Sequence, residues 1–314
     1  MNKEFREQLL DKLEALGSLH PRTGMTYALV YFSKLARLGI SMSRREITRA
    51  TGTTSPFIHS WRTFDRYLGI CKEFVMFCRN HEVNRLHKLT HDTVEAFLMA
   101  KIEKERVKST LKTNMCALQK FFNGCDRPDL RDQLSDDYPR FKELAKSGGT
   151  IHAFDNPDRL IEKISKRDEL SAVVATLQHI TGARIHEVRI MEVREISITI
   201  KGKGGRKRVL DFSSRLDELA EVRNLMIRLK ELADGVDWQK YCQSKDSTYQ
   251  GHVKAACRSL GDIYGGAHGF RGNYAQELRK KLEAKGLTPE EIELIITRDL
   301  GHNRRSMARH YLGV

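Results

Sequence analysis

Apolar residues recur every three or four positions through most of the first 147 residues, which is the spacing of helices with one buried face. The pattern is clearest in the ranges 4–16, 26–39, 61–80, 91–106 and 109–123. Thr90 and Ser109 stand just before two of these ranges or at their start, and both are residue types that cap helix N-termini. Strand-like alternation does not occur here. The sequence therefore predicts an all-helical first domain over residues 1–147.

The pattern changes after residues 148–158, a segment with glycine and proline that is typical of a linker. Residues 168–182 again have helical spacing, and Gly182 stands where a helix would end. Residues 196–212 alternate apolar and polar positions on both sides of KGKGGRK, which predicts a β-hairpin with a basic tip. Helical spacing then resumes. A second domain over residues 159–314 is therefore predicted to be mainly α with a small antiparallel sheet.

Residues 43–64 of the first domain can be interpreted in two ways. A helix, a turn with glycine and a second helix would suit a helix-turn-helix, and residues 1–55 are a candidate for a separate helical or helix-turn-helix-like part. The alternative is two helices of an ordinary bundle. In either case this region supplies basic side chains that are candidates for DNA phosphate contacts: Arg44, Arg45, Arg49, Arg62 and Arg66.

The charge of the chain narrows the class of partner. The 314 residues include 55 Lys and Arg against 41 Asp and Glu, a formal net charge of +14. This excess favours a polyanion, of which nucleic acid is the commonest in a cell, although a merely basic protein has the same balance. No apolar run approaches the roughly 20 residues that span a bilayer, and the first residues lack the apolar centre of a signal peptide. We therefore expect a cytoplasmic, nucleoid-associated protein.

The six cysteines are scattered and form no CxxC pair or zinc-ligand spacing. Cys71 and Cys78 are seven residues apart and would share one apolar helix face. We expect buried free thiols and no metal or redox role.

Four stretches of the second domain carry residues that suit a single task. They are TGARIHEV at 181–188, GKGGRKR at 202–208, HGFRGNYA at 268–275 and LGHNRRSMARHY at 300–311. Arginine can clamp phosphate oxygens, lysine can protonate a leaving oxygen, and histidine can donate or exchange a proton near neutral pH. A tyrosine among such groups can act as a nucleophile toward a phosphate diester.

These stretches resemble, in order, the motifs of the tyrosine recombinases of the phage-integrase type. The resemblance covers roughly residues 165–314 and assigns the catalytic roles to Arg184, Lys203, His268, Arg271, His302 and the nucleophile Tyr311. Glu187 would support the fold behind the first arginine, and Tyr274 would be a packing residue. Any of the lysines of the hairpin could contact phosphate, so Lys201, Arg206 and Lys207 are further candidates for DNA contacts.

The resemblance implies a site-specific recombinase or integrase that forms a 3′-phosphotyrosyl bond and needs no cofactor or metal. A mobile genetic element would be its source. Its expected partners are a double-stranded DNA target site, three further copies in a homotetrameric synaptic complex, and accessory DNA-bending proteins. Two alternatives stay open: a type IB topoisomerase-like enzyme that relaxes DNA, and a non-catalytic DNA-binding regulator.

The chain also departs from the pattern of that family. The interval from Arg184 to Lys203 leaves little room for the usual strand and turn before the hairpin. The segment between Arg271 and His302 is longer than usual and contains an apolar face formed by Ile292, Ile295 and Ile296. That face would either pack within its own domain or dock on a neighbouring protomer.

Overall fold

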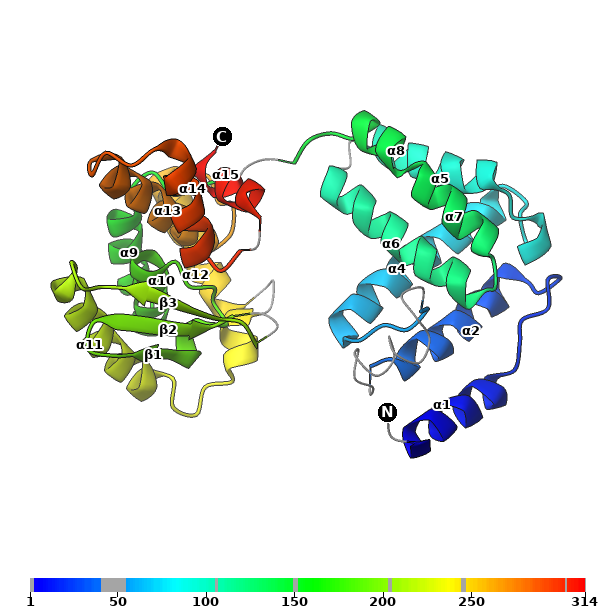
Figure 1. Cartoon of the computed structure of the whole chain (residues 1–314), viewed down its shortest axis with the longest axis horizontal. Coiled ribbons are helices and arrows are strands. Elements are labelled where there is room, and N and C mark those ends of the chain that lie inside the picture. The colour runs from blue at the N-terminus through cyan, green and yellow to red at the C-terminus, as the bar shows by residue number, and fades with distance from the viewer. Residues whose placement is uncertain are drawn as a thin grey trace. The chain divides into compact units, whose positions relative to one another are not determined.

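The computed structural model describes residues 3–40, 55–104, 107–148, 152–202, 205–243, 247–302 and 304–313. The chain divides into two compact units, Met1–Gly148 and Gly149–Val314, and each has its own hydrophobic core (Figure 1). The elements are mostly helices together with one small antiparallel sheet, as the sequence predicts, and this sheet has three strands. Within the described ranges, none of the helices combines the length and the apolar character that a membrane span requires.

The described part of the first unit is built from helices. They are α1 (Lys3–Leu16), α2 (Met25–Leu38), α4 (Trp61–Asn80), η1 (Leu86–Lys88), α5 (His91–Glu103), α6 (Lys108–Gly124), α7 (Pro128–Asp136) and α8 (Tyr138–Leu144). The ring of Phe74 on α4 meets the edges of Phe97, Phe121 and Phe122, with ring centroids between 5.2 and 6.3 Å apart. These aromatic contacts join the apolar faces of α4, α5 and α6 in one core.

The two helix starts expected from Thr90 and Ser109 have different outcomes. Thr90 is the N-cap of α5, and its side chain accepts a hydrogen bond from a backbone N–H three residues later. The expectation for Ser109 is wrong, because α6 begins at Lys108 with Val107 as its N-cap. The backbone N–H of Lys108 donates to the carbonyl of Lys146 at 2.9 Å. A distant segment therefore satisfies a donor that would otherwise need a side-chain cap.

The cysteines are free, and five of the six are buried. Cys71 and Cys78 both lie on the buried face of α4, as their spacing predicts. Burial raises the pKa of Cys78 to about 12. Its thiol therefore stays protonated and serves as packing material.

The second unit packs the buried side of its sheet against helices. They are α9 (Pro157–Ser165), α10 (Glu169–Thr181), η2 (Val188–Ile190), α11 (Leu216–Leu232), η4 (Gln239–Gln243), α12 (Thr248–Leu260), α13 (Gly269–Glu283), α14 (Pro289–Asp299) and α15 (Arg305–Leu312). The strands are β1 (Met191–Val193), β2 (Ser197–Lys201) and β3 (Lys207–Asp211), in the order β1-β2-β3. Ile200 pairs with Arg208 and Lys201 with Lys207, so β2 and β3 form the predicted hairpin.

The short interval before this hairpin holds more structure than we expected. Strand β1 fits between Arg184 and the hairpin and pairs antiparallel with β2, with Met191 opposite Ile200. Only residues 194–196 separate the two strands, and the N–H of Arg194 donates to the carbonyl of Ser197 at 2.8 Å. The tight turn explains how a strand is accommodated in so few residues.

Residues 152–158, which we expected to form part of a linker, pack against the second unit. Phe154 is buried in its core. The side chain of Asn273 accepts from the backbone N–H of Phe154 at 3.1 Å and donates to its carbonyl at 2.7 Å. Asn156 then caps α9 by accepting from the N–H of Arg159. These contacts attach the segment to the helical core that follows it.

Helix α14 resolves the two interpretations of the segment between Arg271 and His302. Ile292 and Ile296 are buried in a cluster with residues of α13 and α15, and Ile295 packs against the same cluster. The helix begins with a capping box at Thr288, as its sequence indicates. The apolar face therefore packs within its own unit, and the docking interpretation is wrong.

Candidate active site

Three of the residues assigned by sequence lie around a fourth, the buried Arg271. Arg271 is on α13, Arg184 follows the end of α10, His302 follows α14, and Tyr311 is on α15. Helix α10 ends at Gly182 in the left-handed region, with φ of 60°. A Cβ atom there would lie 2.5 Å from the ring of Tyr274, so only glycine fits this close approach.

Arg271 is fully buried, and each nitrogen of its guanidinium has a partner. Nε donates to the hydroxyl of Tyr311 at 3.1 Å, Nη1 donates to the carbonyl of Gly182, and Nη2 donates to the carbonyl of Leu300 and to Nε2 of His302. Burial lowers the pKa of Arg271 to about 10, so the group still carries its charge at neutral pH. The arginine thus holds the nucleophile candidate and the neighbouring backbone in fixed positions.

The LGH triplet has a structural explanation in these contacts. Leu300 supplies the carbonyl that Arg271 bonds, and His302 supplies a ring nitrogen. Gly301 lies in the left-handed region, with φ of 63°, and a Cβ atom there would lie 3.1 Å from Cδ of Arg208. The glycine leaves room for this second arginine.

His302 is neutral near pH 7. Burial, followed by the charge of Arg271, lowers the pKa of His302 to about 4. An arginine can only donate, so the 3.2 Å contact makes Nε2 of His302 the acceptor and leaves the ring proton on Nδ1. The His302 and Tyr311 rings have centroids 5.5 Å apart, and Tyr311 is 4% exposed. The phenol is therefore held inside the site rather than presented on the surface.

Glu187 holds Arg184 in place through hydrogen bonds. Its carboxylate is fully buried and accepts from Nη1 and the backbone N–H of Arg184, at 2.7 and 2.8 Å. It also accepts two hydrogen bonds from Arg208, at 2.7 and 3.1 Å. Burial favours a raised pKa for Glu187, but the hydrogen bonds and charges of these arginines outweigh burial and lower its pKa to about 2. Sequence reasoning gave Glu187 its supporting place but missed Arg208.

Two histidines stand near the arginines. His268 precedes α13 and is exposed; the protein atoms around its ring, together with the charges of Arg271 and Arg184, lower its pKa. His186, which the sequence analysis did not select, is also exposed, and its charge acts on His268. In the sequence, only its position within TGARIHEV indicated that His186 would lie near the site.

The predicted catalytic lysine, Lys203, lies outside the described residues, between the ends of β2 and β3. Lys201 and Lys207 face each other as the last pair of this hairpin, and both are exposed. Arg206 is also exposed. The tip of the hairpin therefore carries cations on both of its strands.

A basic cleft of about 1090 Å³ opens beside the site. Its charged lining consists of Arg184, Arg206, Lys207, Arg208, Arg298, Arg304 and Asp211, and His302 also borders it. One carboxylate among six cationic side chains gives a strongly positive surface, which suits a polyanion. Arg184, Arg208 and His302 thus face a space that can hold a phosphate backbone.

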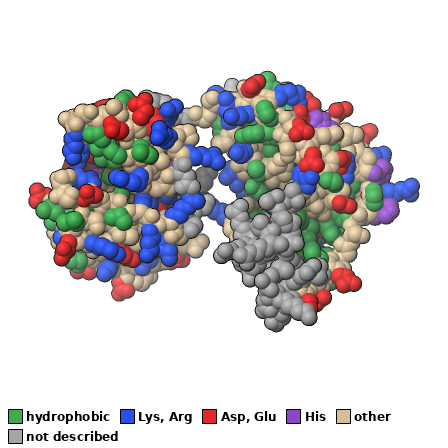
Figure 2. Space-filling view, viewed as in Figure 1, with side chains coloured by type: hydrophobic (Ala, Val, Ile, Leu, Met, Phe, Trp, Pro, Cys, Tyr) green, Lys and Arg blue, Asp and Glu red, His purple; other side chains and the backbone are tan. Residues whose placement is uncertain are grey.

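The DNA-contact candidates of the first unit are only partly described. Arg62 and Arg66 are exposed one helical turn apart on α4, so they share a face. Arg44, Arg45 and Arg49, with the proposed helix-turn-helix, fall in the range 41–54, which lies outside the described residues. Figure 2 shows Lys and Arg side chains on the visible face of each unit, with acidic side chains among them.

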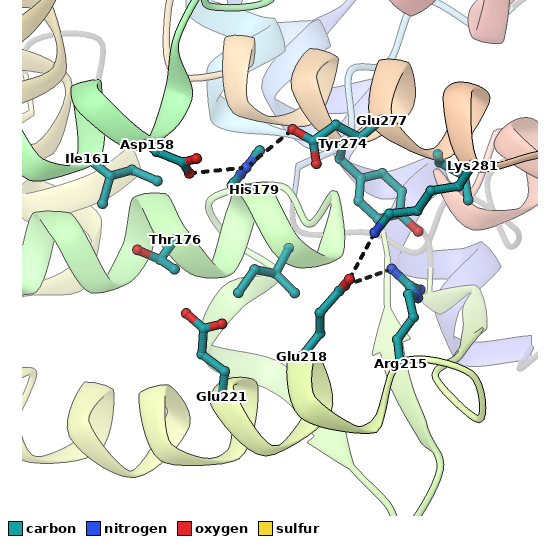
Figure 3. A pocket seen from close by; sticks show the side chains of 12 residues that line it. Asp158, Ile161, Thr176, His179, Arg215, Glu218, Glu221, Tyr274, Glu277 and Lys281 are labelled. Carbon is teal, nitrogen blue, oxygen red and sulfur yellow. Dashed lines mark hydrogen bonds and ion pairs between the residues drawn. The ribbon is translucent and has the colours of Figure 1, made fainter. Parts of the chain in front are cut away.

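A second pocket of the second unit, about 410 Å³ in volume, has a different character (Figure 3). Glu218 accepts from Arg215 at 3.1 Å and from Lys281 at 2.8 Å, and Nε2 of His179 lies 3.4 Å from Glu277. Four carboxylates line this pocket, so it favours a polyanion less than the basic cleft does. Within the described ranges, no three His, Cys, Asp or Glu side chains converge as metal ligands.

Comparison with known proteins identifies the fold of the chain. No protein-family model and no curated protein sequence matches the chain. Among solved structures, a lambda integrase dimer bound to a COC′ core site has a TM-score of 0.62 at 14% identity, covering 99% of this chain and 81% of that one. The chain therefore shares the fold of lambda integrase.

Two further lambda integrase structures agree with this result. The tetramer bound to a Holliday junction has a TM-score of 0.59 at 14% identity, over 92% of this chain and 77% of that one. The structure of lambda integrase residues 75–356 bound to DNA has a TM-score of 0.57 at 15% identity, over 92% of this chain and 95% of that one. At these identities the likeness extends to the fold, and the chemistry of the site must be argued from its own residues.

Proposed function

We propose that the protein is a site-specific DNA recombinase that cleaves and rejoins DNA strands through a 3′-phosphotyrosyl intermediate. The observation that carries this proposal is the hydrogen bond from Nε of Arg271 to the hydroxyl of Tyr311, inside a site that borders a basic cleft. A phenol is a weak nucleophile until its anion is stabilised, and a buried guanidinium already donating to its oxygen does so.

In the proposed reaction, Oη of Tyr311 gives up its proton to water and attacks the scissile phosphorus. The bond from phosphorus to the 5′ oxygen breaks, and Lys203 protonates that oxygen. Arg184, Arg271, His268 and His302 stabilise the charge on the phosphoryl oxygens. A 5′ hydroxyl from the partner strand then returns a proton to Lys203 and attacks the phosphotyrosine, and the phenolate that leaves takes a proton from water. The two transesterifications conserve the number of diester bonds, so the reaction requires no energy source.

The solved lambda integrase structures include a dimer on a core site and a tetramer on a Holliday junction. By analogy we propose that four copies of this chain act together on two DNA sites. The first unit would clamp the DNA through basic residues such as Arg62 and Arg66, while the second unit would carry the chemistry. A source in a mobile genetic element and accessory DNA-bending proteins belong to the same proposal.

Covalent capture tests the proposed reaction. The protein is incubated with nicked DNA duplexes whose sequence is randomised around the nick, because a nick next to the cleavage point releases a short strand and traps the intermediate. We expect an adduct that survives denaturant. Tyr311→Phe should form none and bind DNA almost as the parent does, whereas Tyr264→Phe, which removes a hydroxyl elsewhere in the same unit, should react normally. An adduct formed by Tyr311→Phe at the parent rate would place the nucleophile elsewhere.

The same protein samples separate the two alternatives. A type IB topoisomerase-like enzyme would relax a supercoiled plasmid that lacks a captured site, whereas a recombinase would leave it supercoiled. A non-catalytic regulator would bind DNA and form no adduct. The buried contact between Arg271 and Tyr311 favours the enzyme, because DNA binding alone does not require a phenol held by a charged group inside the protein.

A further inference from the structure

Strand β3 contributes a residue that the motifs do not explain. Arg208 is 7% exposed, although arginine is rarely buried without a specific partner. Its two terminal nitrogens donate to the two oxygens of Glu187, at 3.1 and 2.7 Å. We infer that Arg208 is a positioning residue: it occupies Glu187 on both oxygens and so prevents this carboxylate from drawing Arg271 away from Tyr311. The inference rests on the function proposed above.

The hydrogen bonds of Glu187 account for this role. A carboxylate offers about four lone-pair positions. Here Oε1 accepts from Nη1 of Arg184 and Nη1 of Arg208, and Oε2 accepts from the backbone N–H of Arg184 and Nη2 of Arg208. All four positions are filled. Nη1 of Arg271 stays 4.0 Å from Oε2 and donates instead to the carbonyl of Gly182.

Loss of Arg208 would change this balance. Two acceptor positions on a fully buried carboxylate would become empty, and an unpaired acceptor in such a place is costly. Among the described cations that do not already bond Glu187, Arg271 lies close enough to fill one of them, through the nitrogen that lies 4.0 Å away. A shift of Arg271 toward Glu187 would lengthen its 3.1 Å hydrogen bond to Tyr311. The expected damage is therefore to the geometry of the nucleophile, at a residue that Arg208 does not bond.

The surrounding backbone is shaped to admit Arg208. The residue stands opposite Ile200 in the sheet, on the buried side of β3, where inward and outward residues alternate. Cβ atoms at Gly202 and Gly301 would approach atoms of Arg208 to 3.4 and 3.1 Å, respectively. Glycine at both positions keeps this space open, so the path from β3 to Glu187 depends on three separate segments of the chain.

The test uses Arg208→Met, which keeps an unbranched apolar side chain and removes the guanidinium, and the double variant Glu187→Gln/Arg208→Met. Rates of adduct formation are measured on the captured nicked duplex at saturating protein. We expect Arg208→Met to be about 100-fold slower than the parent, the scale of losing one oriented contact in a transition state. The double variant should be about 10-fold faster than Arg208→Met, because a neutral amide no longer attracts Arg271.

The matched control is Arg228→Met. Arg228 makes a bidentate ion pair with Glu169 on the surface, at 2.7 and 2.9 Å, away from the site. The Arg228→Met variant should form the adduct at the parent rate. If Arg208→Met does not fold, Arg208→Lys replaces it, since lysine keeps the charge but cannot fill both acceptor positions on Glu187. The rescue by Glu187→Gln is then measured in the Arg208→Lys background.

A second measurement does not depend on catalysis. The Nε–H proton of Arg271 is followed by NMR of the free protein, and assigned with the Arg271→Lys variant. Arg208→Met should weaken its protection from solvent exchange, and the double variant should restore it. An unchanged Arg271 signal, a parent-like rate for Arg208→Met, or a double variant no faster than Arg208→Met would each overturn the inference. A parent protein that forms no adduct would instead count against the proposed function, and the NMR result would still decide the role of Arg208.

Discussion

Replacing Glu187 by glutamine keeps the size of a fully buried side chain and removes the negative charge among Arg184, Arg208 and Arg271. Burial acts to raise the pKa of Glu187, yet the arginine contacts lower it from 4.5 to about 2. Because each pKa unit corresponds to about 1.4 kcal/mol, this depression is equivalent to roughly 3 kcal/mol at neutral pH. We therefore expect Glu187→Gln to lower the free energy of unfolding of the second unit at pH 7 by about 3 kcal/mol.

The pH dependence gives the sign of the effect. A depressed carboxylate pKa stabilises the folded state fully above the unfolded value of 4.5, and this stabilisation is lost as the pH falls through about 2. The difference between the parent and Glu187→Gln should therefore shrink from about 3 kcal/mol at pH 7 to about 1 kcal/mol at pH 3.

The assay is urea unfolding at pH 7, 5 and 3, followed by circular dichroism on the parent and Glu187→Gln. Glu169→Gln is the control, because Glu169 bonds Arg228 in solvent and its charge should contribute far less. The reasoning would be refuted if Glu187→Gln lowered the free energy of unfolding equally at pH 7 and pH 3. The loss would then come from the changed shape of the side chain and not from its charge.

Further predictions concern the chemistry, the DNA and the packing. If Lys203 is the general acid, a 5′-bridging sulfur substrate should restore cleavage by Lys203→Ala and not by Arg184→Ala, as measured by adduct yield; rescue of another hairpin lysine variant instead would reassign the acid. DNA affinity should fall steeply between low and physiological salt in a binding titration, because phosphate contacts release counterions, and a flat response would contradict a two-domain clamp. Gly182→Ala should cost about 2–4 kcal/mol in urea unfolding, since its φ is 60° and its new Cβ would lie 2.5 Å from a tyrosine ring. Ile296→Asp should prevent folding of the second unit by circular dichroism, whereas Leu294→Asp, at a position 53% exposed on the same helix, should fold; equal tolerance of both would contradict the packing of α14.

The sequence by itself determined the features that depend on near neighbours in the chain. Thr90 and Thr288 cap helices because a side chain and the backbone N–H three residues later meet within one turn. Gly182 ends α10 because the left-handed conformation favours glycine. Apolar spacing fixed most helices, and alternation fixed the β2–β3 hairpin, since both follow from which side of an element faces the core. The motif order was sufficient to select Arg184, Arg271, His302 and Tyr311 as candidates, and the fold brings these four together.

Contacts between segments that are far apart in the chain could not be predicted from the sequence. Lys108 begins α6 one residue before the expected cap because its N–H bonds Lys146, which is 38 positions later in the chain. The apolar face of α14 could have packed inward or on another copy, and only the presence of α13 and α15 beside it decided the outcome.

The clearest case is Arg208. On its strand it is one of several basic residues, and its spacing gives no reason to separate it from Arg206 or Lys207. Its role follows from the strand register and from the space beside Gly301, which bring its guanidinium to Glu187, 21 positions earlier in the chain. Local propensity cannot report such a contact, because the energy of a buried ion pair depends on the desolvation and the remaining partners of both groups, and these exist only once the chain has folded.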